Sequence, residues 1–369
     1  MASIRKYTTA KGAAWRVQYR SPDGKSRTKQ PFSTKGAAEA WAAKNTVDIH
    51  TQQWVSSEMT RRTVCDYKNK FFTTKAHLAE GSLVSMRRSW NNWVEPSWGH
   101  RKISSIRTSE VQAWLSKHAN QASTIRRAHG ILAGIIDIAM EDGCVNKNHA
   151  RGVTLPSKPS PKHVYLTASQ LTRLAEECRE WGPMVMLLGT TGMRWSEMAG
   201  LQAGDIPDIG SRVQLTRAAK WVDRTLHVGE LKTHEGRTIS LSSQSMAYLR
   251  SLAKGQSSDA WLFTDSDGQP MRQLDHHSRF HMAVNRLVKS GDLPKRVTPH
   301  GLRHVAAGLM ISSNTNVKAV QRQLGHKSAA MTLDVYADLF DTDLDQVGRA
   351  MDALVTNVVQ LSCDSPDSV

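Results

Sequence analysis

The sequence predicts a multidomain α+β fold, with a small N-terminal three-stranded sheet plus one helix, a helical bundle, and a mainly α domain with a small β-sheet. Three observations support this prediction. Polar and apolar residues alternate within the first 32 residues, whereas apolar residues recur at helical spacing over residues 63–150. Residues 151–163 are rich in Pro, Ser and basic residues, which is typical of an extended linker between domains.

The N-terminal module is expected to be a sheet covered by one helix. Turn residues at 21–24 favour a hairpin. A helix should follow over residues 36–51, because Ala38, Trp41 and Ala42 recur on one face. The three expected strands are residues 4–8, 15–19 and 25–32.

Basic residues are concentrated in this module. Residues 1–65 contain twelve Lys and Arg against four Asp and Glu, and the difference is half of the whole chain's net charge of +16. A three-stranded sheet with basic strands fits the major groove of DNA, although a protein-interaction module remains the alternative. The candidate DNA-contacting residues here are Arg5, Lys6, Arg16, Arg20, Lys25, Arg27 and Lys29.

The overall composition favours a polyanion-binding protein of a reducing compartment. The pI is about 9.9. An enzyme that acts on small metabolites does not need such an excess of basic residues, whereas a polyanion-binding protein does. The four cysteines are far apart, so neither a disulfide framework nor a zinc site is predicted. No long apolar segment or signal sequence is evident, so we expect a cytoplasmic protein without membrane or export roles.

The predicted bundle contains no residues at the spacing of a catalytic motif. Arg126 and Arg127, on its longest helix, are either solvated or candidate DNA contacts. Its four expected helices cover residues 64–79, 82–93, 109–118 and 123–142.

The domain after the linker begins with a capping box, Thr167 to Gln170. Helical patterns follow, interrupted by a β-rich insert over residues 213–241.

Near the end of this domain, four side chains point to a phosphate site with its own nucleophile. His300 and Arg303 should share one helix face, because they are three residues apart. Gly325 should end a short helix and place His326 at its end, and an amphipathic turn then leads to Tyr336. A guanidinium, two imidazoles and a phenol can bind and attack a phosphate.

These motifs resemble the tyrosine recombinase (phage integrase) family, and within it the actinobacterial and mycobacteriophage-type integrases that have an N-terminal arm-binding domain. The similar stretches are H-G-L-R-H at 300–304, L-G-H at 324–326 with a tyrosine ten residues later, G-T-T-G-M-R-W-S-E-M at 189–198, and L-K-T at 231–233 before Arg237. The resemblance implies an arm-type DNA-binding domain at 1–60, a SAM-like core-binding bundle at 63–150, a linker at 151–163, a catalytic domain at 164–358 and a tail at 359–369.

The resemblance also implies the roles of the site residues. Arg194 and Arg303 neutralise the scissile phosphate. Tyr336 attacks and forms a 3′-phosphotyrosyl bond, and His300 accepts its proton or hydrogen-bonds the phosphate. The remaining implied residues are Lys232, which protonates the leaving 5′-oxygen, His326, a further donor, and Glu197, which orients a positive partner.

Some assignments stay open. Lys220 and Lys254 are alternatives to Lys232, and Arg237 is either a neighbouring phosphate contact or solvated. Many family members place the tyrosine nine residues after the second histidine rather than ten, which puts the turn before Tyr336 in doubt. Some have Trp in place of His326. No metal or other cofactor is predicted, because no carboxylate cluster or phosphate-binding glycine loop is present.

The implied function is site-specific recombination of double-stranded DNA, by integration and excision of a phage or mobile element. The implied partners are core-type and arm-type attachment sites, three further copies of the chain in a tetramer, a host DNA-bending protein and a recombination directionality factor. Apolar residues after Asp341 recur at helical spacing and are expected to pack on a neighbouring protomer. The alternatives are a type IB topoisomerase-like nicking-closing enzyme and a non-catalytic DNA-binding regulator.

Overall fold

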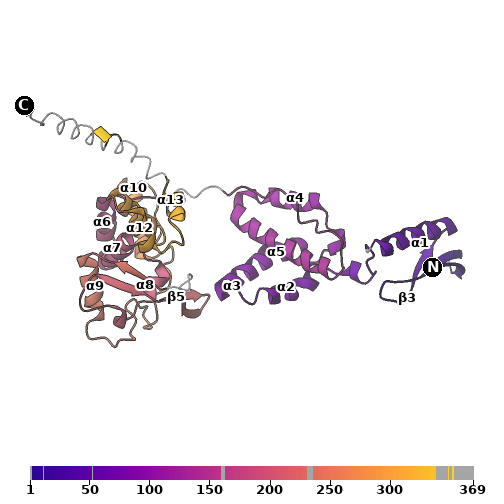
Figure 1. Cartoon of the computed structure of the whole chain (residues 1–369), viewed down its shortest axis with the longest axis horizontal. Coiled ribbons are helices and arrows are strands. Elements are labelled where there is room, and N and C mark those ends of the chain that lie inside the picture. The colour runs from indigo at the N-terminus through magenta and orange to yellow at the C-terminus, as the bar shows by residue number, and fades with distance from the viewer. Residues whose placement is uncertain are drawn as a thin grey trace, which may run out of the picture. The chain divides into compact units, whose positions relative to one another are not determined.

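The computed structural model divides the chain into two compact units, Met1–Ser160 and Pro161–Val369 (Figure 1). It describes residues 2–10, 12–51, 53–158, 163–230, 236–337, 348 and 351–352. Lys232 therefore lies outside the described residues. Most residues after Asp341, which were predicted to pack on another protomer, also lie outside them.

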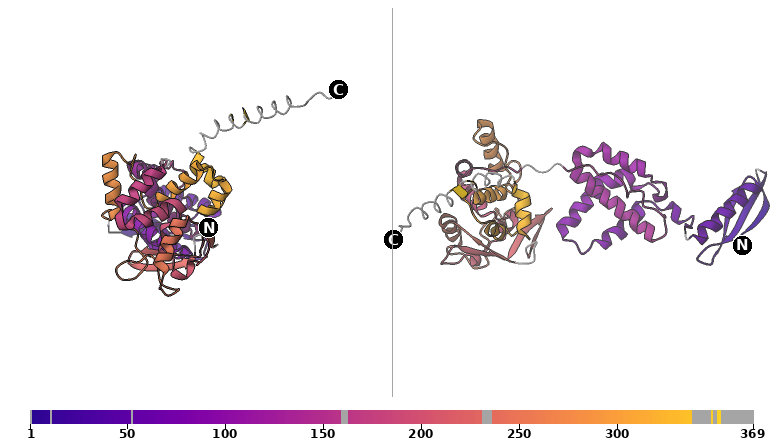
Figure 2. Two further views of the ribbon diagram at one scale, coloured as in Figure 1. Left: turned by 90° about the vertical axis from the view of Figure 1, so that its left-hand side faces the viewer. Right: turned by 45° about the horizontal axis from the view of Figure 1, so that its top comes forward.

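The N-terminal module is the predicted sheet and helix. The three strands form one antiparallel sheet in the order β1-β2-β3. The helix α1 lies along one face of this sheet (Figure 2), where Val17 packs on Ala38 and Ala42. The elements are β1 (Ser3–Thr9), β2 (Gly12–Arg20), β3 (Ser26–Phe32) and α1 (Lys35–His50).

The helical part of the first unit has a core of large apolar side chains, including Trp90, Leu115 and Ile125. Its main elements are α2 (Lys68–Thr74), α3 (Glu80–Ser89), the π-helical η3 (Trp90–Gly99), α4 (Thr108–Lys117) and α5 (Ala122–Glu141), with 3₁₀ turns at Met59–Arg61, Cys65–Tyr67, Ile103–Ser105 and Ala119–Gln121.

Two helix lengths in this part were predicted wrongly. The expected helix over 64–79 is only the 3₁₀ turn and α2, because the hydroxyls of Thr73 and Thr74 hydrogen-bond backbone carbonyls of the preceding turn and compete with helix continuation. The helix expected to end at residue 93 instead continues as η3 to Gly99. Pro96 lacks a backbone N–H, and the wider π-helical turns accommodate it.

The second unit is mainly helical, and its strands form two antiparallel pairs, β4 with β7 and β5 with β6. The Thr167 capping box forms as expected, with both reciprocal hydrogen bonds to Gln170. The helices are α6 (Ala168–Glu177), α7 (Gly182–Thr191), α8 (Trp195–Ala199), α9 (Ser243–Ala253), α10 (Arg279–Ser290), α11 (Leu302–Ser312), α12 (Val317–Leu324) and α13 (Ala329–Tyr336). The strands are β4 (Arg212–Leu215), β5 (Arg217–Val222), β6 (Thr225–Glu230) and β7 (Arg237–Ser240), and 3₁₀ turns lie at Arg179–Trp181 and Ala203–Asp205.

Across the parts of the chain that the structure describes, no helix combines the length and apolarity that crossing a membrane requires.

Candidate active site

Arg303 lies in the interior of the second unit, where its side chain is held by two helix ends. The residue is only 5% exposed. Its Nη1 donates to the carbonyl of Gly192 at 2.7 Å and its Nη2 to the carbonyl of Leu324 at 2.6 Å. These carbonyls terminate α7 and α12, where the helix dipoles place partial negative charge.

This arrangement orients the guanidinium without neutralising it. Burial and the charge of Arg194 lower the pKa of Arg303 to about 9, so it stays protonated at neutral pH. Gly192 makes the close approach possible, because it has a φ of +69° and a Cβ there would lie 2.4 Å from a methyl carbon of Leu324. The result is a buried cation with its charge available for an anion.

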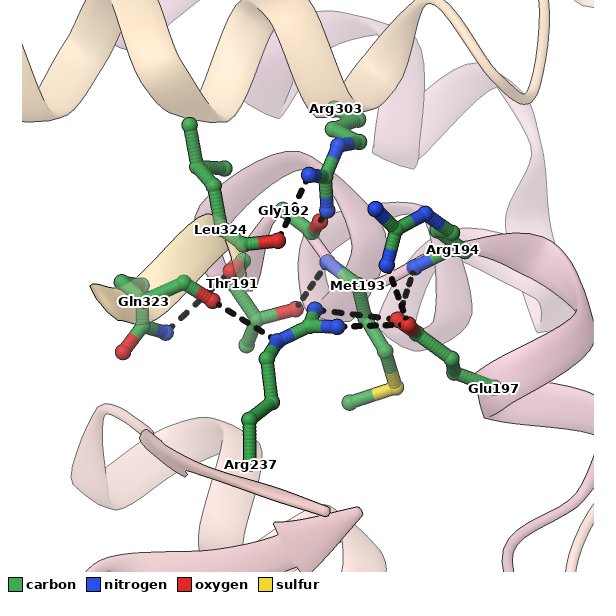
Figure 3. Close-up of polar contacts among 9 residues, drawn as sticks. All are labelled: Thr191, Gly192, Met193, Arg194, Glu197, Arg237, Arg303, Gln323 and Leu324. Atoms are coloured by element: carbon green, nitrogen blue, oxygen red, sulfur yellow. Dashed lines mark hydrogen bonds and ion pairs between the residues drawn. The ribbon is translucent and has the colours of Figure 1, made fainter. Parts of the chain in front are cut away.

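Arg194 is positioned by a carboxylate that it shares with a second arginine (Figure 3). Arg194 precedes α8, and its Nη1 donates to Glu197 at 2.6 Å while its backbone N–H donates to the other carboxylate oxygen at 2.7 Å. Arg237, at the start of β7, donates to both oxygens of Glu197 and also to the carbonyl of Gln323. The Glu197 carboxylate thus accepts hydrogen bonds from two arginine side chains.

The Glu197 side chain is 1% exposed, so its charge depends on these two arginines. Burial alone would raise the pKa of the carboxyl, but the charge and hydrogen bonds of Arg237 and Arg194 lower it below its ordinary value. The Arg237 side chain is 11% exposed and donates hydrogen bonds to Glu197 and to the carbonyl of Gln323. It is therefore not solvated, and it acts as a buried link between β7, α8 and α12.

His300 is not on the helix that was predicted to carry it. Helix α11 begins at Leu302, and His300 lies in the turn before it. This turn is closed by the Thr298 hydroxyl, which accepts from the backbone N–H of Gly301 at 2.9 Å. The prediction that His300 and Arg303 share a helix face was wrong for this reason. Desolvation and the charges of Arg303 and Arg194 lower the pKa of His300.

Tyr336 is the last residue of α13 and is fully buried. Its ring belongs to a small apolar cluster with Ala307, Ile311 and Val320. Burial raises the pKa of the phenol to about 12, and the charge of Arg303 opposes this shift. The hydroxyl is therefore protonated at neutral pH and needs a proton acceptor before it can attack.

The hydrogen-bond partner of Tyr336 is His304, which was not among the predicted site residues. His304 Nδ1 lies 3.1 Å from the tyrosine oxygen. The ring of His304 stacks on that of His163, with centroids 3.8 Å apart. Helical spacing could have indicated this, because His304 is three residues before Ala307 and seven before Ile311, both of which pack near Tyr336.

His326 follows the left-handed Gly325 at the end of α12, as expected. Its Nδ1 lies 2.9 Å from the Thr332 hydroxyl, and its ring is nearly parallel to that of Tyr336 at 6.3 Å. Burial and the charges of Arg303 and Arg194 lower the pKa of His326 to about 4. The ring is thus neutral at physiological pH.

The loop that would carry Lys232 is not described, so the choice among the candidate lysines stays open. β6 ends at Glu230 and β7 begins at Arg237. Of the alternatives, Lys220 is exposed on β5 and Lys254 directly follows α9.

The basic residues of the N-terminal sheet lie on both of its faces. Val17 faces α1, so the alternation along β2 directs Arg16 and Arg20 to the opposite face, and Arg5 is directly paired with Arg16. We call the surface formed by Arg5, Arg16 and Arg20 the open face. The register places Lys6, Arg27 and Lys29 on the α1 side, and Lys25 is in the turn before β3. In the bundle, Arg126 donates to the carbonyl of Pro156 and Arg127 to the Ser85 hydroxyl.

Comparison with protein-family models matches residues 165–343 to the phage integrase family. These residues belong to the phage integrase family. The integrase of Mycobacterium phage D29 is 25% identical over 323 residues, covering 82% of this chain and 83% of that protein. The transposase from transposon Tn916 of Enterococcus faecalis is 26% identical over 279 residues, covering 68% of each.

Solved phage and transposon integrases share the fold. The Tn1549 transposon integrase in complex with a circular intermediate DNA aligns with a TM-score of 0.66 at 21% identity, covering 77% of this chain and 99% of that one. A lambda integrase tetramer bound to a Holliday junction aligns with a TM-score of 0.56 at 16% identity, covering 89% of this chain and 94% of that one. The alignments with these integrases therefore cover much more of the chain than residues 165–343.

Proposed function

We propose that this phage integrase family member is a site-specific DNA recombinase, which cuts and rejoins double-stranded DNA through a covalent intermediate at Tyr336. The observation that carries the proposal is Arg303, a buried guanidinium held by helix carbonyls, whose charge acts on the buried Tyr336 phenol. Within the described residues it pairs with no carboxylate, and a phosphodiester supplies the missing negative charge.

The reaction is a transesterification at phosphorus. The Tyr336 oxygen bonds to the phosphorus, and the bond to the 5′-oxygen breaks. Arg194 and Arg303 stabilise the charge that builds on the non-bridging oxygens, and His326 donates a further hydrogen bond. A lysine from the loop between β6 and β7, for which we favour Lys232, protonates the leaving 5′-oxygen. The phosphotyrosyl bond conserves the energy of the broken bond, so rejoining needs no other energy source.

The relatives support a proposal for the ligand and the assembly. The Tn1549 and lambda integrases were solved with DNA, and lambda integrase as a tetramer on a Holliday junction. This supports double-stranded DNA and a tetrameric synapse for this chain. We also propose a host DNA-bending protein and a recombination directionality factor as partners, and the bacterial cytoplasm, where chromosomal DNA is, as the location.

The test of recombination uses plasmids with two copies of a duplex that has been selected from a random-sequence pool by binding to the full chain. A recombinase should convert this plasmid to deletion or inversion products. A plasmid with one copy is the control and should give none. Relaxation of both plasmids without any product would favour the nicking-closing enzyme, and binding without cleavage would favour a regulator.

We propose that the open face of the N-terminal sheet binds arm-type DNA sites. Arg5 and Arg16 are directly opposite each other, and the guanidinium of Arg16 lies 5.7 Å from the centre of the Tyr7 ring. The Nε of Arg16 is shielded from solvent and has no hydrogen-bond partner. Paired cations on the face of the sheet opposite α1 match the phosphates that flank a major groove.

Replacing both Arg5 and Arg16 with alanine should weaken binding of the full chain to the selected DNA. The slope of log affinity against log salt should fall by about 1 for each phosphate that the variant no longer neutralises. The matched control is Lys35→Ala, because Lys35 is an exposed cation on α1. Equal salt slopes in the double variant and the wild type would contradict the assignment of this face.

A further inference from the structure

The Tyr336 hydroxyl has a hydrogen-bonding environment that differs from the one implied by the family motif. In the described part of the chain, its one hydrogen bond is to His304 Nδ1, at 3.1 Å. The implied proton acceptor, His300, is in the turn before α11, and its ring centre is 5.8 Å from that of His304. Because Tyr336 is fully buried, bulk water does not reach its oxygen.

We propose that His304, rather than His300, accepts the proton of Tyr336 during attack on the phosphate. This inference rests on the proposed function and names a further catalytic residue for the same reaction. His304 qualifies because its ring nitrogen already contacts the reacting oxygen at the distance that proton transfer requires. His300 is then free to hydrogen-bond the phosphate, which is the other role that the motif implied.

The His304 ring is held in one plane by its neighbours. It stacks on His163 at 3.8 Å with an angle of 25° between the rings, and it meets His300 edge to face. His163 and Tyr165, close to the start of the second unit, both lie near the Tyr336 ring. The segment that begins the second unit therefore covers the side of the nucleophile and keeps the imidazole aligned with the phenol.

The charge state of His304 suits an acceptor. Burial, together with the electrostatic effect of the neighbouring His163, His300, Arg303 and His326 side chains, lowers the pKa of His304 to about 4. The ring is neutral at pH 7, so one nitrogen has a free lone pair. A phosphodiester bound beside Arg303 adds negative charge, which raises the pKa of a neighbouring imidazole and makes it a stronger base.

The step balances. The Tyr336 O–H bond breaks and its proton moves to His304 Nδ1, while the oxygen bonds to phosphorus. The bond from phosphorus to the 5′-oxygen breaks, and the leaving oxygen takes a proton from the general acid. When the 5′-hydroxyl attacks to rejoin the strand, His304 returns its proton to the tyrosine oxygen. His304 ends the cycle as it began.

The test measures the rate of covalent complex formation on the selected duplex, after the wild type has been used to map the cleaved phosphate. His304→Ala should lower this rate by about 10²–10⁴, the usual contribution of general acid–base catalysis. His304→Asn should be about as slow, because the Asn oxygen takes the place of Nδ1 and accepts a hydrogen bond but is not basic. Recovery of the wild-type rate by His304→Asn would overturn the proposal and leave His304 as a positioning residue only.

A second substrate distinguishes removal of the tyrosine proton from protonation of the leaving 5′-oxygen. It carries sulfur in place of the bridging 5′-oxygen, and a thiolate leaves without needing a proton. His304→Ala should stay slow on this DNA, because the tyrosine proton must still be removed. Full rescue by sulfur would place His304 on the leaving-group side and overturn the proposal.

Two measurements keep the outcomes distinguishable. Wild-type DNA affinity and an unchanged thermal unfolding midpoint for His304→Asn show that the variant is folded. Tyr336→Phe reports on the proposed function: if it still forms the covalent complex, the nucleophile itself is wrong. If Tyr336→Phe is inactive while His304→Ala cleaves at the wild-type rate, only the role of His304 is wrong.

Discussion

Replacing Arg303 with alanine is expected to lower the rate of covalent DNA cleavage by about 10²–10³, the usual cost of removing one donor to a developing oxyanion. The structure supports a large effect, because this guanidinium is buried and has its charge available for a phosphate. Single-turnover cleavage of the selected duplex at saturating protein measures the effect without a contribution from binding.

Arg303→Lys should recover little of this loss. A lysine keeps the charge, but it cannot donate to the carbonyls of Gly192 and Leu324 and still present two parallel N–H groups to a phosphate. Arg173→Ala is the matched control, since Arg173 is an exposed arginine of the same domain. A cleavage rate for Arg303→Ala within about threefold of the wild type would show that Arg303 is not at the reacting phosphate.

Replacing Glu197 with alanine is expected to lower the free energy of unfolding of the second unit by about 3–5 kcal/mol, as found when one partner of a buried ion pair is removed. Arg237, 11% exposed, would keep its charge but lose the carboxylate that it shares with Arg194. Chemical denaturation, followed by fluorescence, gives the difference. The control is Glu176→Ala, an exposed carboxylate paired with Arg173, which should change stability by less than about 0.5 kcal/mol.

The stability difference should depend on pH in one direction. The folded-state pKa of Glu197 lies below the ordinary value of 4.5, so its ionised form stabilises the fold fully above that pH. The contribution is lost as pH falls through the folded-state pKa. Wild type and Glu197→Ala should therefore converge in stability in acid and differ most near neutrality. A difference in the free energy of unfolding of less than about 1 kcal/mol at pH 7 would show that Glu197 and its two arginines do not stabilise the fold as a buried ion-pair network.

The sequence was informative wherever a local pattern determines the structure. Alternation in the first 32 residues predicted the sheet, and the order of Arg194, Arg303, His326 and Tyr336 indicated the family, which the match to residues 165–343 confirms. Helix ends were predictable where a residue type requires them, as at Gly325 with its left-handed backbone.

The sequence was uninformative where contacts between distant segments determine the position or the partner of a side chain. Whether Arg237 meets phosphate or Glu197 depends on how β7 packs beside α8 and α12, which no local spacing encodes. The position of His300 depends on a turn closed by the Thr298 hydroxyl, whereas three-residue spacing indicated a helix. The partnership of His163 with His304 joins residues 141 positions apart, so periodicity could not reveal it.

Covalent trapping on nicked, labelled DNA of the selected sequence, with wild type and Tyr336→Phe compared, tests whether Tyr336 is the nucleophile. The phenylalanine fills the same buried volume, so folding and DNA binding should be retained. We expect a band shifted by the mass of the protein for the wild type and no shifted band for the variant. A shifted band that persists in Tyr336→Phe would contradict the assignment of Tyr336 as nucleophile, because another residue would then carry the DNA.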